Sequence, residues 1–199
     1  MPKLFYQGHG SFRLTTNDGR VIYVDPYAGE GYDMPADIIL VSHQHGDHNQ
    51  VDLCAKKPEC KIITNAEALE GGRHNNFDFA GQSGIIIEAV EAYNKNHDPA
   101  NCVGYIITLD GISVYASGDT SKTNQMEALA NYDIDYALFC GDGIYNMGLE
   151  EAAECAKLIK AKNNIIIHLK PQALFDREMA EKWDAPNKLI IEPNEEISL

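Results

Sequence analysis

The first half of the chain alternates apolar and polar residues over short stretches, which is typical of β-strands. The turn Asn17-Asp18-Gly19 separates two of these stretches and predicts a hairpin. A continuous apolar run over 37–41 predicts a strand that is buried on both faces. We expect further strands on either side of these, over 3–7, 11–16, 20–24, 62–64, 84–91, 102–109 and 112–116.

The second half of the chain alternates strand and helix patterns. It predicts strands over 136–140 and 163–167, and helices over 123–131 and 174–183. Between the two strands, apolar residues at helical spacing predict an amphipathic helix: Leu149, Ala152, Ala153, Ala156 and Ile159. A strand-rich first half joined to alternating strands and helices favours two packed sheets with helices outside, a mixed α and β fold.

The size and apolar patterning of the chain place it among globular proteins. Its 199 residues contain no internal repeat or linker, so we expect one domain spanning 1–199. The longest apolar runs are far shorter than the roughly 20 residues that span a bilayer, which argues against a membrane protein. The N-terminus lacks a signal-peptide pattern, and the expected location is therefore cytoplasmic.

Charge and cysteine usage narrow the expected partners. The formal net charge is −14, and such a surface repels nucleic acid, although a local site can still be positive. The five cysteines are odd in number and show no CxxC spacing. We interpret them as reduced thiols, mostly buried.

Three of the seven histidines fall within His43-Gln44-His45-Gly46-Asp47-His48, directly after the buried strand at 37–41. If the backbone is still extended there, His43 and His45 point to the same side and can bind one ion. Gly46 then lets the chain turn, so that Asp47 and His48 face a second position. The alternative is a solvated loop, or histidines that cap a following helix.

Three later residues also lie where a predicted strand gives way to a loop. They are His97, Asp119 in Gly118-Asp119-Thr120, and His168 at the end of the strand at 163–167. Taken singly, each has an ordinary alternative: a surface histidine, a helix N-cap and a buried core histidine, respectively. Strand ends are also where mixed α and β folds assemble their sites.

This pattern resembles the metallo-β-lactamase fold superfamily, and the resemblance covers nearly the whole chain. The matching parts are an Asp that ends an early strand (Asp25), the HxHxDH loop, a later His, an Asp in Gly-Asp-Thr and a final His. The opening 8–12 and the segment 145–153 resemble a branch of small metal-dependent hydrolases related to the ascorbate-6-phosphate lactonases. The resemblance implies an α+β fold, a four-layer αβ/βα sandwich with metals at one edge between two β-sheets.

The resemblance also implies a dinuclear site and a role for each residue. One ion would bind His43, His45 and His97, and another would bind Asp47, His48 and His168. Asp119 would bridge them, and Asp47 and Asp119 would be the catalytic carboxylates. Asp25 would orient the ligand loop from behind, unless it simply ends a strand, and His9 would line the site or hydrogen-bond within its turn. A nitrogen and oxygen ligand set without Cys admits Zn, Mn or Fe.

Two divalent ions about 3.5–4 Å apart can share a hydroxide, so water would be the nucleophile. The expected function is hydrolysis of a small ester-like substrate such as a lactone, and an anionic substrate is compatible with a locally positive site. Lys170 follows His168 closely, and we interpret it as solvated surface. Fold analogy does not select the substrate or the oligomeric state.

Three alternatives remain open at this stage. The first is a phosphodiesterase or nuclease of the same fold, which the acidic charge disfavours. The second is diiron redox chemistry, but those proteins carry an acidic residue where His45 stands and need a flavin domain that 199 residues cannot hold. The third is a catalytically idle metal-binding module.

Overall fold

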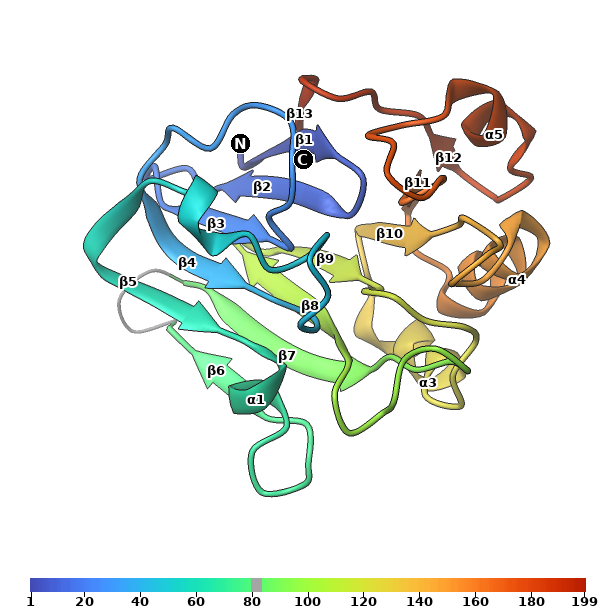
Figure 1. Cartoon of the computed structure of the whole chain (residues 1–199), viewed down its shortest axis with the longest axis horizontal. Coiled ribbons are helices and arrows are strands. Elements are labelled where there is room, and N and C mark those ends of the chain that lie inside the picture. Colours follow the sequence, from blue (N-terminus) through green and yellow to red (C-terminus); the bar gives the residue numbers. More distant parts are fainter. Residues whose placement is uncertain (80–83) are drawn as a thin grey trace.

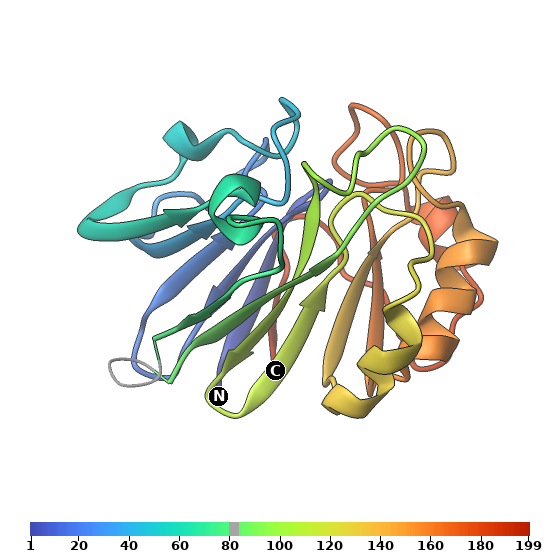
Figure 2. The same cartoon turned by 90° about the horizontal axis from the view of Figure 1, so that it is seen from below.

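Two β-sheets packed face to face dominate the computed structural model, which describes residues 1–79 and 84–199 (Figures 1 and 2). Within those residues, the first sheet has six strands in the order β13-β1-β2-β3-β4-β5 and the second has seven in the order β12-β11-β10-β9-β8-β7-β6. Both sheets mix parallel and antiparallel pairs. The α+β class expected from the sequence is therefore confirmed.

The opening meander forms as predicted and leads to β4, the strand that precedes the HxHxDH loop. Strands β1 (Lys3–Gly8), β2 (Ser11–Thr15) and β3 (Val21–Val24) pair antiparallel in sequence order. β4 (Ala36–Leu40) then lies parallel to β3, with four of its five residues buried. β4 ends at Leu40, one residue earlier than the strand predicted over 37–41. The first sheet is completed by β5 (Lys56–Ile63) and β13 (Glu196–Ser198).

The second sheet contains the predicted strands of the middle and the C-terminal half. They are β7 (Ile86–Glu91), β8 (Val103–Leu109), β9 (Ile112–Ala116), β10 (Tyr136–Cys140) and β11 (Asn163–Ile167). β6 (Asn76–Asp78) and β12 (Lys188–Leu189) extend its two edges. Both edge strands are too short to leave a pattern in the sequence.

The outer face of the second sheet is covered by helices, which Figure 2 shows along one flank. α4 (Leu149–Ile159) matches the predicted amphipathic helix and buries its apolar stripe. The helix expected over 123–131 is instead a turn of α3 (Met126–Leu129) followed by the 3-10 helix η2 (Ala130–Tyr132). The helix expected over 174–183 is shorter, α5 (Arg177–Lys182), because Asp176 caps its start. These helices pack a second core around Trp183.

The outer face of the first sheet is covered differently. Its buried side chains, among them Tyr23 and Ile39, pack under Tyr32 and Met34 of the loop after β3 and under the 3-10 helix η1 (Val51–Leu53). A four-residue helix, α1 (Asn65–Ala68), follows β5 and begins with a capping box made by Thr64 and Glu67. The strand predicted over 62–64 is β5, which begins six residues earlier than predicted, at Lys56, and ends before Thr64, where this cap begins. Within the described part of the chain, no helix combines the length and apolarity that crossing a bilayer requires.

All five cysteines are free thiols, and four of them are buried. Burial raises the pKa of Cys54 and Cys155 to about 12, and it raises those of Cys102 and Cys140 as well. Only Cys60 is partly exposed.

We therefore expect iodoacetamide at pH 8 to label Cys60 first and to leave the other four thiols unreacted while the protein is folded. A raised pKa lowers the thiolate fraction at any given pH, and burial blocks access. Peptide mass spectrometry of briefly labelled protein checks this, with urea-unfolded protein as the control in which all five react. Early labelling of Cys102 or Cys140 would contradict it.

Candidate metal centre

Six of the seven histidines converge at one edge of the two sheets. They come from the β1–β2 turn and from the loops after β4, β7 and β11, which lie along the same edge of the molecule in Figure 2. Asp119 joins them from the loop after β9. The seventh histidine, His74, is exposed between α1 and β6 and belongs to none of the possible metal-binding groups. The structure thus brings together every metal-ligand candidate inferred from the sequence.

The first group of donors consists of His43, His45 and His97. Nδ1 of His45 lies 3.0 Å from Nε2 of His43 and 3.3 Å from Nε2 of His97. The backbone has already left the strand at these positions, yet both imidazoles of the HxH pair still face the same point. These three nitrogens can therefore act on one ion.

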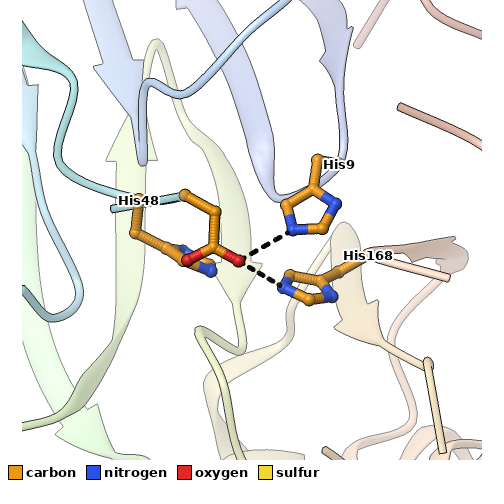
Figure 3. Close-up of side chains that lie close together, drawn as sticks. His9, His48 and His168 are labelled. Carbon is orange, nitrogen blue, oxygen red and sulfur yellow. Dashed lines mark hydrogen bonds and ion pairs between the residues drawn. The ribbon is translucent and has the colours of Figure 1, made fainter. Parts of the chain in front are cut away.

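The second group consists of His9, Asp47, His48 and His168. Nε2 of His9 and Nε2 of His168 lie 3.2 and 3.9 Å from Oδ2 of Asp47. Figure 3 shows both rings directed at one carboxylate oxygen. His48 and His168 stack with ring centroids 5.3 Å apart. His9 therefore lies within the donor cluster and contacts Asp47 directly.

Asp119 lies between the two groups, and its two oxygens face different histidines. Oδ2 is 3.3 Å from Nε2 of His97 and 3.9 Å from that of His43. Oδ1 is 3.3 Å from Nε2 of His48 and 3.5 Å from that of His168. Asp119 caps no helix, because the next helix begins only at Met126. Its position is that of a carboxylate able to bridge two ions.

Asp25 anchors the ligand loop from behind. Its carboxylate accepts hydrogen bonds from the backbone N–H and the hydroxyl of Ser42, both at 2.7 Å, and lies 2.9 Å from Nδ1 of His48. Ser42 Oγ in turn lies 2.9 Å from Nδ1 of His43. Since the Ser42 hydroxyl donates to Asp25, its oxygen accepts from His43. One buried carboxylate thus orients a histidine of each group.

Two further anchors were not among the sequence candidates. Asn94 Oδ1 lies 2.9 Å from Nδ1 of His97, and Asp142 Oδ2 lies 3.2 Å from Nδ1 of His168. Asp142 also accepts backbone N–H bonds through Oδ1 from residues 144–146. Neither residue has a diagnostic spacing. The weak signal available was that both follow strands that end at the same edge as the ligands.

The donor chemistry fits divalent ions. In His43, His48 and His97, Nδ1 faces an oxygen that accepts, so Nδ1 carries a proton, and each ring in its neutral form would present a bare Nε2 to the cluster. Nε2 of His48, both ring nitrogens of His168 and Oδ1 of Asp119 are buried without a hydrogen-bond partner. Lone pairs and carboxylates that converge in this way are the usual surroundings of a bound metal.

Charge within the cluster shifts the pKa values in both directions. Burial alone would lower the pKa of His48, but the carboxylates of Asp119 and Asp25 raise it well above the usual value. Burial would raise the pKa of Asp119, but His48 and His168 lower it strongly. Burial and the charge of His48 together lower the pKa of His43 to about 3. Asp119 is therefore ionised at neutral pH, which is the form that binds cations.

The cluster opens to solvent beside His45 and Asp47. His45 is exposed and the Asp47 side chain is 37% exposed, whereas the other donors are buried. Lys170 is exposed and lies 3.9 Å from Asp176, in keeping with a solvated surface residue. Access for a small molecule is therefore from the side of the HxHxDH loop.

Replacing Asp142 with Ala should weaken binding of the ion on the His168 side by roughly 10- to 100-fold, the range typical of residues that orient a ligand. The change frees the His168 ring and also removes the acceptor that holds residues 144–146. Metal affinity measured by chelator competition checks this. As a matched control, Asp176→Ala removes the cap of α5, so it should cost about 0.5–2 kcal/mol of stability and leave the affinity unchanged. Equal affinities in both variants would show that Asp142 does not orient His168.

Comparisons with known proteins agree with this fold. The family model described as a beta-lactamase superfamily domain matches residues 3–168. A UPF0173 metal-dependent hydrolase of Thermococcus onnurineus is 29% identical over 227 aligned positions, covering all of both chains. A solved structure from Parabacteroides distasonis, provisionally named a metal-dependent hydrolase, has a TM-score of 0.78 at 30% identity over 96% of this chain and 93% of that one. Igni18, a metallo hydrolase of Ignicoccus hospitalis, shares the fold at 22% identity, with a TM-score of 0.77 over 98% and 97% of the two chains.

Proposed function

Because this chain belongs to the beta-lactamase superfamily, as its sequence resemblance indicated, we propose that it is a dinuclear metal-dependent hydrolase acting on a small ester-like substrate such as a lactone. The observation that carries the proposal is the position of Asp119, whose two oxygens face His97 and His43 on one side and His48 and His168 on the other. A carboxylate with a purely structural role would not need one oxygen facing each of two histidine groups.

The residues that would hold the two ions follow from the two donor groups. His43, His45 and His97 would hold one, Asp47, His48 and His168 the other, and Asp119 would serve both. Bound divalent ions supply ionised water near neutral pH and polarise the oxygen of the bond that breaks. The absence of thiolate donors from the cluster suits Zn, Mn or Fe.

The protein's own residues contribute orientation and charge. Asp25 and Asn94 each hold one ring by a hydrogen bond, so that its other nitrogen faces the cluster. The Asp142 carboxylate lies at ion-pair distance, 3.2 Å, from Nδ1 of His168. No thiol nucleophile is supported, because the buried cysteines have raised pKa values. Water is therefore the nucleophile that this site can use.

The local charge favours a small anionic or neutral substrate. Two divalent ions and the carboxylates Asp47 and Asp119 leave a positive site on a protein whose net charge is −14. The acidic surface disfavours nucleic acid as a substrate. Five free thiols fit a cytoplasmic location.

Elemental analysis of protein purified without added metal, followed by assays on chromogenic esters, lactones and phosphodiesters, tests the proposal. We expect about two ions per chain and turnover of lactones or esters that a chelator abolishes. His74→Ala should leave both results unchanged, because His74 lies outside the cluster. A saturating content of one ion would overturn the dinuclear site, and turnover of phosphodiesters alone would overturn the substrate class.

A further inference from the structure

His9 occupies an unusual place for a histidine in a hairpin turn. The residue is fully buried, although turns between paired strands usually face solvent. Its φ is +56°, in the left-handed region that favours glycine. A strained backbone and a buried polar ring are retained together only when surrounding contacts compensate for both.

Both ring nitrogens of His9 face oxygens that can only accept. Nδ1 lies 3.0 Å from the carbonyl oxygen of Ala173, and Nε2 lies 3.2 Å from Oδ2 of Asp47. The carbonyl requires the proton on Nδ1, so a neutral ring turns a bare lone pair toward a carboxylate. That arrangement is repulsive unless Nε2 is protonated, as in an ion pair with Asp47, or a metal cation lies between Nε2 and Oδ2. His43, His48 and His97 are anchored through Nδ1 in the same way.

We propose that His9 is a metal ligand through Nε2, and that it completes the half-site of Asp47, His48 and His168. This inference rests on the proposed dinuclear site and adds a donor to it. Two ligand atoms at 2.0–2.2 Å from one ion lie roughly 2.8–3.8 Å apart when they subtend 90–120° at the ion. His9 and Asp47 meet that spacing at 3.2 Å, as His48 and Asp119 do at 3.3 Å.

The turn is built to hold the ring in that position. The carbonyl oxygen of His9 accepts the backbone N–H of His168 at 2.9 Å, and the two ring centroids are 3.7 Å apart. Gly10 lies directly beside it, and a Cβ there would lie 3.0 Å from Cε1 of His48, so a larger residue would press on that ring. The positions of His9, His48 and His168 are therefore set against one another through backbone and packing contacts (Figure 3).

Counting His9 makes the two half-sites unequal. The second ion gains five protein donors (His9, Asp47, His48, His168 and Asp119), whereas the first has four (His43, His45, His97 and Asp119). An ion with fewer protein donors keeps more open positions for water and substrate. The first ion lies beside the exposed His45, where solvent reaches the cluster.

The test compares His9→Asn with His74→Asn. Asn tolerates the left-handed backbone, so the turn is kept, but its amide is too short to reach Asp47. We expect His9→Asn to lower the affinity for one of the two ions by at least about 100-fold in chelator competition. A residue that only orients a ligand typically changes the affinity by roughly 10- to 100-fold. The visible spectrum of the Co²⁺-loaded variant should change as well. His74→Asn should match the natural protein in both measurements.

A second measurement uses the natural protein and does not depend on how the variant folds. Each Co²⁺-bound imidazole keeps one ring N–H, which gives a paramagnetically shifted exchangeable proton signal. Six such signals are expected if His9 binds metal with the other five clustered histidines, and five if it does not.

Five signals, or an unchanged spectrum and affinity in His9→Asn, would show that His9 is an imidazolium that only hydrogen-bonds Asp47. Either result would leave the dinuclear hydrolase standing. Failure of the natural protein to bind two ions would instead overturn the proposed function.

Discussion

Asp119→Ala should bind one metal ion or fewer and lose at least about a hundredfold in turnover, roughly 2.7 kcal/mol of barrier. Among the residues that the structure describes, Asp119 is the side chain whose two oxygens face both donor groups. Its removal leaves two positive charges near each other without the shared carboxylate that compensates for them. Elemental analysis and turnover of the best substrate from the panel are the two measurements, taken on the same preparation.

The variant should remain folded, because Asp119 makes no helix cap and belongs to neither sheet. Circular dichroism and a thermal melt establish this. Asp142→Asn is an informative companion, since it keeps an acceptor beside His168 but removes the charge, and it should bind two ions. Full metal occupancy and near-normal turnover in Asp119→Ala would rule out the dinuclear mechanism even if HxHxDH still bound metal.

The sequence predicted best those parts of the fold whose periodicity is unambiguous. Strands β9, β10 and β11 have the predicted limits, and α4 has the predicted buried stripe. In each case one hydrophobic pattern is bounded by a turn or by a cap. The weak predictions were helices whose ends depend on local capping, such as α5, which starts only after the Asp176 cap.

Other elements exist only because of long-range pairing. β13 pairs with β1 at the opposite end of the sequence, and β12 adds two residues to the edge of β11. Short edge strands have no hydrophobic alternation of their own, so their position is set by the strand that they pair with. No local pattern could have indicated them.

The candidate site also contains residues with a sequence signal and residues without one. Its donors could be predicted because the spacing of HxHxDH is typical of metal ligands and because the later candidates follow the ends of strands. The anchoring residues could not, since Asn94 and Asp142 are ordinary loop polar residues until the fold places them at 2.9 and 3.2 Å from the rings of His97 and His168. A one-dimensional pattern identifies ligand atoms more readily than it identifies the partners that orient them.

The paired variant His43→Ala/His45→Ala should lower the metal content from two ions to one. His43 and His45 supply two of the three histidine nitrogens of the first group but none of the second, which keeps His48, His168 and Asp47. Elemental analysis at increasing metal concentration measures the loss. Turnover should fall at least about a hundredfold as well, because a site with one ion loses half of its charge stabilisation.

The mirror variant His48→Ala/His168→Ala should keep the first ion and lose the second. Together the two variants separate the half-sites, with His74→Ala as the control that alters a histidine outside the cluster. Loss of both ions from either variant would mean that the half-sites cannot fill independently. Retention of two ions in His43→Ala/His45→Ala would mean that the HxH pair is not a metal-binding unit, and the first half-site would have to be built from other donors.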